Sequence, residues 1–248
     1  MSIFGIVDSG QKIVGNGLVL YLDAAQLRSY PRSGTTWTDL SGNGSNATLN
    51  NGPTFNSSNG GSIAFDPNQN LQYASFASTT VGSFNNATFS YGAWFYHDGN
   101  PQAGNIMGKR SPNPFNQYAM GIGNNALFGD SGTKLIAFAI SDQADGQQIN
   151  YSYQLPAAGW YYGMVVINNN VQNMYANGVS VANSTATFAN KTFNITGKPF
   201  YIAAQNNNFD QVASLFRGRV AIAFLYNRAL SAEEVSQNYN ALRIRFGV

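Results

Sequence analysis

The sequence predicts an all-β fold, a two-sheet antiparallel jelly-roll sandwich with a short C-terminal helix. Short apolar and alternating runs recur along the chain, each bounded by Gly, Asn, Pro or Ser, which is typical of sandwiches and jelly rolls. Only the end of the chain has helical periodicity. With 248 residues, 26 glycines, 14% aromatic and 10% charged residues, the composition fits one large β domain whose polar surface is mostly uncharged.

Eleven segments read as strands because their apolar residues alternate or form short continuous runs. They are residues 17–24, 61–66, 87–96, 104–109, 117–123, 134–141, 159–168, 171–176, 179–184, 199–205 and 216–227. Asn177-Gly178 lies between two of these runs, so it predicts a type I′ hairpin turn. The tight connection at 167–171 adds a third antiparallel strand to the same series.

The segment "RALSAEEVSQNYNAL" predicts the helix. Ser231 is a suitable N-cap, and Glu234 three residues later completes a capping box. Val235, Tyr239 and Leu242 then recur at helical spacing. They form one face that we expect to lie on the sandwich.

We divide the chain into an N-terminal arm, residues 1–15, and one jelly-roll domain, residues 16–248. The arm carries an apolar run but no partner pattern, so it fits equally an added edge strand and an arm that docks on another subunit. The first residues lack the basic segment and long apolar stretch of a secretory signal.

Charge and composition exclude several function classes. With a net charge of +2 and only small basic clusters, the sequence does not predict the extended basic surface that binds nucleic acid. No apolar run approaches the ~20 residues of a membrane span, and the absence of cysteine excludes disulfides and thiolate metal sites. His97 is the only histidine. A glycosidase needs two carboxylates across a cleft, and no predicted strand carries acidic residues at alternate positions, which would place them on one face. We therefore expect no enzymatic activity.

Sugar binding is one remaining possibility, because aromatic rings stack on sugar faces and amides pair with hydroxyls. The candidate residues are Trp37, beside a glycine-rich loop, and His97 and Asn100, which follow the strand 87–96. A core position for Trp37 and an ordinary exposed histidine at 97 are the competing interpretations.

Calcium is the one metal that the sequence suggests, since it accepts carboxylate, amide and backbone oxygens. The candidate ligands are Asp39, Asn43, Asn46 and Asp66, in two loops with a single carboxylate each. Turn formation by Asn and Gly explains both loops without a metal.

Several segments, taken in order, resemble the concanavalin A-like lectin/glucanase superfamily, more closely its laminin-G-like jelly-roll branch, over residues 17–243. They are "GLVLYLDA", "WTDLSGNGSNATL", "GGSIAFD", "FSYGAWFY", "GWYYGMVVINNNVQNMYANGVSV" and "FRGRVAIAFLYNRALSAEEVSQNYNAL". The resemblance implies two curved antiparallel sheets and, in many members, a carbohydrate or protein ligand and a calcium ion at one edge. Ala221 and Ala223 stand where calcium-bearing relatives commonly have an acidic residue, and the glucanase carboxylates are absent.

The form "SYPRSGTTWTDLSGNG" looks like versions of this domain in bacteriophage virion proteins. That likeness implies a non-enzymatic structural or adhesion protein of a phage particle, such as a capsid decoration or a tail or fibre component, located in the virion. Its expected partners are other virion proteins or copies of itself, with cell-surface polysaccharide as a candidate ligand. The alternative is a bacterial lectin-like carbohydrate-binding module, extracellular or on the cell surface, with no virion role; a glycoside hydrolase is a more distant third.

Overall fold

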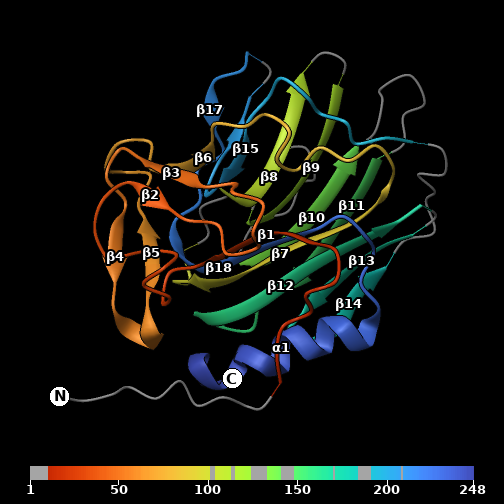
Figure 1. Ribbon diagram of the computed structural model, residues 1–248. Helices are drawn as coiled ribbons and strands as arrows, with labels where there is room; N and C mark the ends of the chain where they lie inside the picture. Colours follow the sequence, from red (N-terminus) through yellow and green to blue (C-terminus); the bar gives the residue numbers. More distant parts are fainter. Residues whose placement is uncertain are drawn as a thin grey trace.

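Two eight-stranded sheets face each other in the computed structural model and form a sandwich (Figure 1). The structure describes residues 11–100, 104–112, 115–123, 133–140, 148–169, 171–183, 191–207 and 209–248. Residues 1–10, most of the predicted arm, lie outside the described residues. All strand pairs within the two sheets are antiparallel, which confirms the predicted jelly-roll sandwich.

The first sheet has the strand order β14-β13-β12-β7-β18-β5-β4, and β1 also pairs with β18. Its strands are β1 (Leu18–Asp23), β4 (Thr54–Asn56), β5 (Ser62–Phe65), β7 (Thr88–His97), β12 (Gly159–Asn168), β13 (Val171–Ala176), β14 (Val179–Asn183) and β18 (Gly218–Tyr226). A short 3₁₀ turn, η1 (Ser58–Gly60), connects β4 to β5.

The second sheet has the order β11-β10-β9-β8-β15-β6-β3-β2. Its strands are β2 (Thr36–Trp37), β3 (Ala47–Asn50), β6 (Tyr73–Phe76), β8 (Gly104–Pro112), β9 (Phe115–Ile122), β10 (Lys134–Ile140), β11 (Gln148–Gln154) and β15 (Phe200–Ile202). A separate two-stranded hairpin, β16 (Gln205–Asn206) and β17 (Val212–Ala213), follows β15.

The strands that the sequence pattern missed are short or polar. β2, β3, β4, β6, β16 and β17 have two to four residues, too few for a period of two to be recognised. β11 is longer, but its sequence "QINYSYQ" is mostly polar. The predicted hairpin turn is confirmed, since Asn177 and Gly178 both have positive φ, 50° and 78°.

The main core lies between the sheets and is dominated by aromatic side chains. Phe84 and Phe89 stack with ring centroids 4.2 Å apart, and Tyr118 lies 4.9 Å from Phe89. The largest fully buried members of this core are Trp37, Phe89, Tyr91, Phe95, Tyr118, Phe193 and Phe200. Burial of each such ring stabilises the fold by about 1.5–3 kcal/mol.

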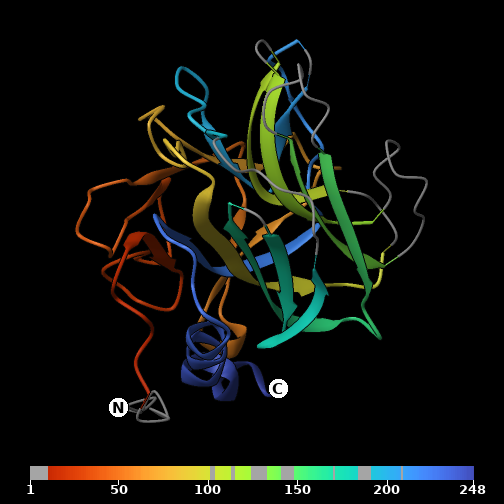
Figure 2. The ribbon, with the colours of Figure 1, turned by 90° about the vertical axis from the view of Figure 1, so that its right-hand side faces the viewer.

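A second, smaller core lies between the outer face of the first sheet and α1 (Ala232–Phe246). Figure 2 shows the helix alongside the sandwich. Trp94 stacks on Phe246 and on Tyr239, at 4.2 and 5.7 Å between centroids. The predicted capping box of Ser231 and Glu234 is present. Among the described residues, no helix has the length and apolar character needed to cross a membrane.

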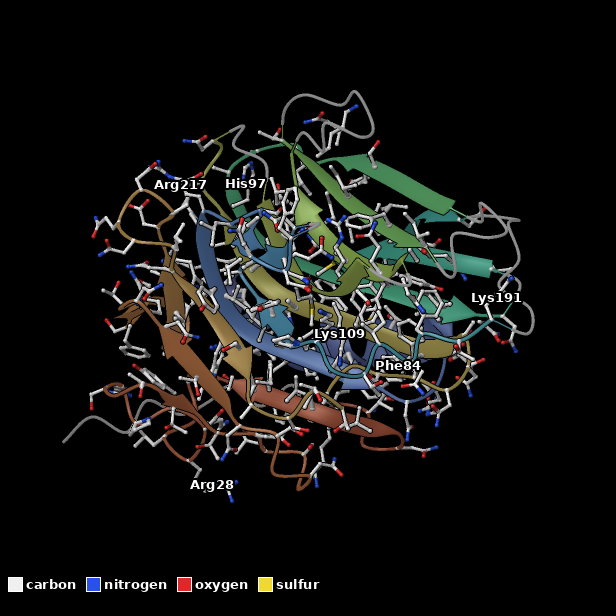
Figure 3. The ribbon with its side chains drawn as sticks, turned by 90° about the horizontal axis from the view of Figure 1, so that it is seen from above. Arg28, Phe84, His97, Lys109, Lys191 and Arg217 are labelled. Atoms are coloured by element: carbon white, nitrogen blue, oxygen red, sulfur yellow. The ribbon has the colours of Figure 1, made fainter. Side chains whose placement is uncertain are left out.

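A lysine is buried at the edge of the main core. Lys109 on β8 is 0% exposed, and its ammonium donates to Thr79 O, Val81 O and Ser83 Oγ at 2.6, 2.6 and 2.8 Å (Figure 3). These acceptors satisfy the three donors of the ammonium. Lys109 therefore ties the loop 79–83 to the second sheet, and within the described ranges no carboxylate pairs with it.

This lysine predicts a pH-dependent stability. Burial lowers the pKa of Lys109 to about 7, whereas an unfolded lysine titrates near about 10.4. Between these values the unfolded chain binds more protons, so this contribution to the free energy of unfolding rises with pH. In urea unfolding we expect Lys109→Met to remove that rise, so the difference between wild type and variant grows from about pH 7 to 9.

The variant is also less stable overall, because the buried carbonyl of Val81 loses a donor, at about 1–3 kcal/mol, and the partly buried carbonyl of Thr79 loses one as well. Lys12→Met, at an exposed position, is the matched control and should follow the wild-type profile. A stability difference between wild type and Lys109→Met that is constant with pH would contradict the assignment.

Candidate functional site

Aromatic and polar side chains gather on the outer face of the second sheet where β6, β15 and β8 run side by side. Phe200 and Ile202 point into the core, so Tyr201 between them points outward. Its neighbours in the register are Ser75 and Gly108. Tyr73 packs edge-on against Tyr201, with centroids 5.7 Å apart. Tyr73 is partly exposed but Tyr201 is only 6% exposed, so this face offers little open ring surface of its own.

Charged groups border these tyrosines on one side. Lys198 forms an ion pair with the Oδ2 of Asp210, and Asn206 Nδ2 donates to the Oδ1 of Asp210 at 2.9 Å. Arg110 Nη1 donates to the backbone oxygen of Asn206 at 3.5 Å. The hydrogen bond from Lys198 holds the pKa of Asp210 below its usual value. Asp210 thus stays ionised at neutral pH between two cations.

The tip of the β16–β17 hairpin carries an exposed aromatic ring. Phe209 is 81% exposed. This is unfavourable for a phenylalanine, because burying its ring would stabilise the fold by about 1.5–3 kcal/mol. The turn that presents it is tightly hydrogen-bonded: Asn207 Oδ1 accepts from the N–H groups of Phe209 and Gln211 at 2.8 and 3.1 Å, and Asn207 N–H donates to Gln211 O at 2.8 Å. The backbone that carries the ring is therefore held in place, and the ring itself is not covered.

Buried amides connect the hairpin to β8. Asn105 Nδ2 donates to Gln205 Oε1 at 3.1 Å. Gln205 Nε2 and Asn206 Oδ1 are buried and have no partner among the described residues, although buried polar atoms are normally hydrogen-bonded. We name Arg110, Lys198, Tyr201, Asn206, Phe209 and Asp210 the hairpin site. It combines ring surface with donors and acceptors, which is the chemistry that recognises polyhydroxyl compounds.

The residues predicted from sequence to bind sugar lie elsewhere. Trp37 on β2 is 0% exposed and belongs to the main core. His97, at the end of β7, is 1% exposed, and burial lowers its pKa, an effect that the carboxylate of Asp98 partly opposes. Neither ring is open to a ligand, so the binding role predicted for these two residues does not fit their positions. Asn100 is partly exposed, in the turn where its N–H donates to Asp98 Oδ1 at 2.9 Å.

The residues predicted to bind calcium form two separate hydrogen-bonded turns. Both oxygens of Asp39 accept two hydrogen bonds, from Tyr21 N–H and Ser41 N–H on Oδ1 and from Ser41 Oγ and Ser45 N–H on Oδ2, at 2.8–3.1 Å. Four donors saturate a carboxylate. Asp39 therefore fixes its own loop to β1 without a metal.

The other predicted ligands also have protein partners. Asn46 Oδ1 accepts from Asp39 N–H at 2.9 Å, and Asn43 Nδ2 donates to Ser41 Oγ at 2.9 Å. Asp66 Oδ1 accepts from Asn68 N–H at 3.0 Å, and no hydrogen bond links Asp66 to the other three in the described part of the chain. Within that part, no three His, Cys, Asp or Glu residues gather as a metal site would require. Calcium binding stays a prediction.

Sequence reasoning missed the hairpin site because Arg110 is far in the chain from its other members, which lie within residues 198–210 and follow no strand or helix pattern. Arg110 and Asp210 are one hundred positions apart, and only the packing of β16 against β8 brings them together. One signal was available. Phe209 is a single aromatic residue within the polar segment "QNNNFDQ", where no strand or helix pattern explains an apolar side chain.

Solved structures with the same fold include sugar-binding and toxin domains. Domain 4 of AbnA, a GH43 extracellular arabinanase from Geobacillus stearothermophilus in complex with arabinotriose, matches with a TM-score of 0.59 and 14% identity, over 90% of this chain and 98% of that chain. The binding domain of Paraclostridial Mosquitocidal Protein 1 matches with a TM-score of 0.64 and 13% identity, over 90% of this chain and 52% of that one.

A sialidase from Trypanosoma rangeli, in complex with sialic acid, matches with a TM-score of 0.59 and 15% identity. This match covers 92% of this chain and 33% of the sialidase. The chain therefore spans about a third of the sialidase, and about half of the mosquitocidal binding domain. At these identities the likeness shows the fold alone.

The family is shown by the sequence itself. No protein with a curated description matches the chain. The sequence model of the Laminin_G_3 family, described as the concanavalin A-like lectin/glucanases superfamily, matches residues 68–236, which is more than half of the 248 residues. The chain belongs to the concanavalin A-like lectin/glucanases superfamily.

Proposed function

We propose that this protein is a non-catalytic carbohydrate-binding domain and that the hairpin site holds the sugar. The observation that carries the proposal is Phe209, 81% exposed on a hydrogen-bonded turn beside the charged residues Asp210 and Lys198. A large apolar ring held open to water, with polar groups around it, is typical of a binding surface. The fold supports the class, because the arabinanase domain of the same fold was solved with arabinotriose.

Each part of the site has a role in this proposal. The Phe209 ring stacks on the C–H face of a sugar ring, as aromatic rings do with apolar surfaces. Asp210 and Lys198 accept from and donate to neighbouring hydroxyl groups, and charge-assisted hydrogen bonds of this kind are the stronger ones. The partly exposed Arg110 extends the surface toward the sheet and can contact a second sugar unit, while Tyr201, 6% exposed, supports the site without contacting the sugar.

Phe209→Ala tests the proposal. A glycan array with bacterial, plant and sialylated oligosaccharides identifies a ligand, and calorimetry then compares wild type and variant. We expect the affinity to fall about 10-fold, since loss of one stacking ring at about 1.4 kcal/mol corresponds to that factor. The melting temperature should not fall, because the ring has almost no protein contacts to lose.

Val179→Ala is the matched control, because Val179 is another exposed apolar side chain, 66% exposed, on a hairpin of the first sheet. It should bind like wild type. Absence of binding to every glycan on the array, or equal affinity of Phe209→Ala and wild type, would reject the hairpin site.

We also propose that the protein is a structural or adhesion component of a bacteriophage particle, a capsid decoration or a tail or fibre protein. The support is the form of the segment "SYPRSGTTWTDLSGNG", which resembles phage virion proteins. Mass spectrometry of purified particles tests this proposal, and we expect the chain among the virion proteins. Its absence from purified particles would favour the alternative, a bacterial lectin-like module with no virion role.

A calcium site is tested separately. An ion held by Asp39, Asn43, Asn46 and Asp66 would stabilise the folded state by mass action, so the melting temperature should rise with calcium chloride and fall with a chelator. Asp66→Asn should reduce that shift, because it removes a carboxylate whose only hydrogen bond among the described residues is from Asn68. An unchanged melting temperature in chelator would exclude a structural calcium ion.

A further inference from the structure

Three side chains form a row across the outer face of the first sheet. Trp160 on β12 stands opposite Tyr96 on β7, and Tyr96 stands opposite Arg219 on β18. Residues opposite each other on neighbouring strands point to the same face. The row lies beside the end of α1, where Trp160 contacts Phe246 with ring centroids 4.7 Å apart.

The guanidinium of Arg219 lies over both rings of this row. Its Cζ atom is 3.9 Å from the centroid of Tyr96 and 5.2 Å from that of Trp160. A cation over an aromatic face is attracted by the ring, and a stacked arginine keeps the edges of its plane for hydrogen bonds. The charge of Arg219 is thus held in one orientation on a partly exposed surface.

Arg219 has no acidic partner in the described part of the chain. Its one side-chain hydrogen bond is from Nη1 to Asn56 Oδ1 at 3.2 Å. Three other arginines, in contrast, pair with carboxylates: Arg217 with Asp98, Arg228 with Glu234 and Arg245 with Asp23. A guanidinium has five donors, so most of those on Arg219 are left for a group from outside.

The surroundings of the row are fixed by η1. Trp160 Nε1 donates to Asn59 Oδ1 at 3.0 Å, and Asn59 Nδ2 donates to the backbone oxygen of Arg245 at 3.1 Å. The indole, the turn and the end of α1 are therefore joined. A ligand that binds here would meet a surface that is already ordered, which reduces the entropy lost on binding.

We propose that Tyr96, Trp160, Arg219 and Asn56 form a second binding site, which takes the carboxylate of an acidic saccharide. The guanidinium edge binds the carboxylate in a forked, charge-assisted pair, while the partly exposed Asn56 amide and Tyr96 ring contact hydroxyl and C–H groups of the same sugar. Trp160, 6% exposed, holds the guanidinium in place and does not itself contact the sugar. This site lies on the other sheet from the hairpin site, and it goes beyond the function proposed above.

Binding of a galacturonic acid hexamer tests the proposal, with its methyl ester as the neutral partner of equal size. Calorimetry measures affinity, and intrinsic tryptophan fluorescence reports on Trp160. We expect the acid to bind and the ester to bind at least about 10-fold more weakly, because esterification removes the charge-assisted pair. Arg219→Gln should weaken binding of the acid by at least about 10-fold, and Arg219→Lys by a smaller factor, since lysine keeps the charge but loses the planar fork.

Three further variants keep the test independent of folding defects. Asn56→Asp places a carboxylate beside an intact Arg219, so it should compete with the ligand and weaken binding of the acid. Arg217→Gln removes a nearby arginine that already pairs with Asp98, and it should bind like wild type. Phe209→Ala should also bind the hexamer like wild type, which separates this site from the hairpin site.

Four results would overturn the proposal. They are absence of binding to the acid, equal binding of acid and ester, equal affinity of Arg219→Gln and wild type, and an equal loss in Arg217→Gln, which would indicate a general charge effect. Equal affinity for a glutamate hexapeptide would overturn the saccharide assignment and indicate an acidic peptide instead.

Discussion

The central strands β7, β12 and β18 carry buried side chains on both faces, and the rest of the molecule is arranged to satisfy that constraint. One face packs on the second sheet, as in any sandwich. The other face bears Trp94, Tyr162 and Phe224, which would be costly to leave in water. The helix α1 covers them, so its position follows from the composition of the first sheet.

Polar contacts fix this cover in place. Arg245, near the end of α1, pairs with the buried Asp23 of β1 at 2.7 Å and donates to the backbone oxygens of Asn59 and Gly61 at 2.7 and 2.6 Å. A buried ion pair contributes little unless its remaining donors and acceptors are satisfied; here each nitrogen of Arg245 donates one hydrogen bond, and both oxygens of Asp23 accept from the protein. Loss of Arg245 would leave the charge of the buried Asp23 unpaired in the interior, at about 3–5 kcal/mol.

With the cores closed in this way, the possible binding surfaces are at the margins of the fold. The hairpin site stands on a small two-stranded unit beside the second sheet, and its turn is held by local hydrogen bonds rather than by the core. Changes in Phe209 or Asp210 therefore have small effects on stability, and such a site can change its ligand without disturbing the sandwich. The Arg219 row, in contrast, is joined to the end of α1 through Asn59 and Trp160.

The sequence by itself determined the fold class, the Asn177-Gly178 turn and the capped C-terminal helix, because each depends on residues close together in the chain. Periodicity and turn chemistry are local, so the long strands β7, β12 and β18 were predicted near their observed bounds. The tertiary structure alone decided which polar residues meet. It showed that Trp37 and His97 are buried and that Asp39 is saturated by hydrogen bonds, and it brought Arg110 to the hairpin and Arg219 over two aromatic rings. These contacts join residues up to more than a hundred positions apart, and strand order and register, which no local pattern encodes, place them together.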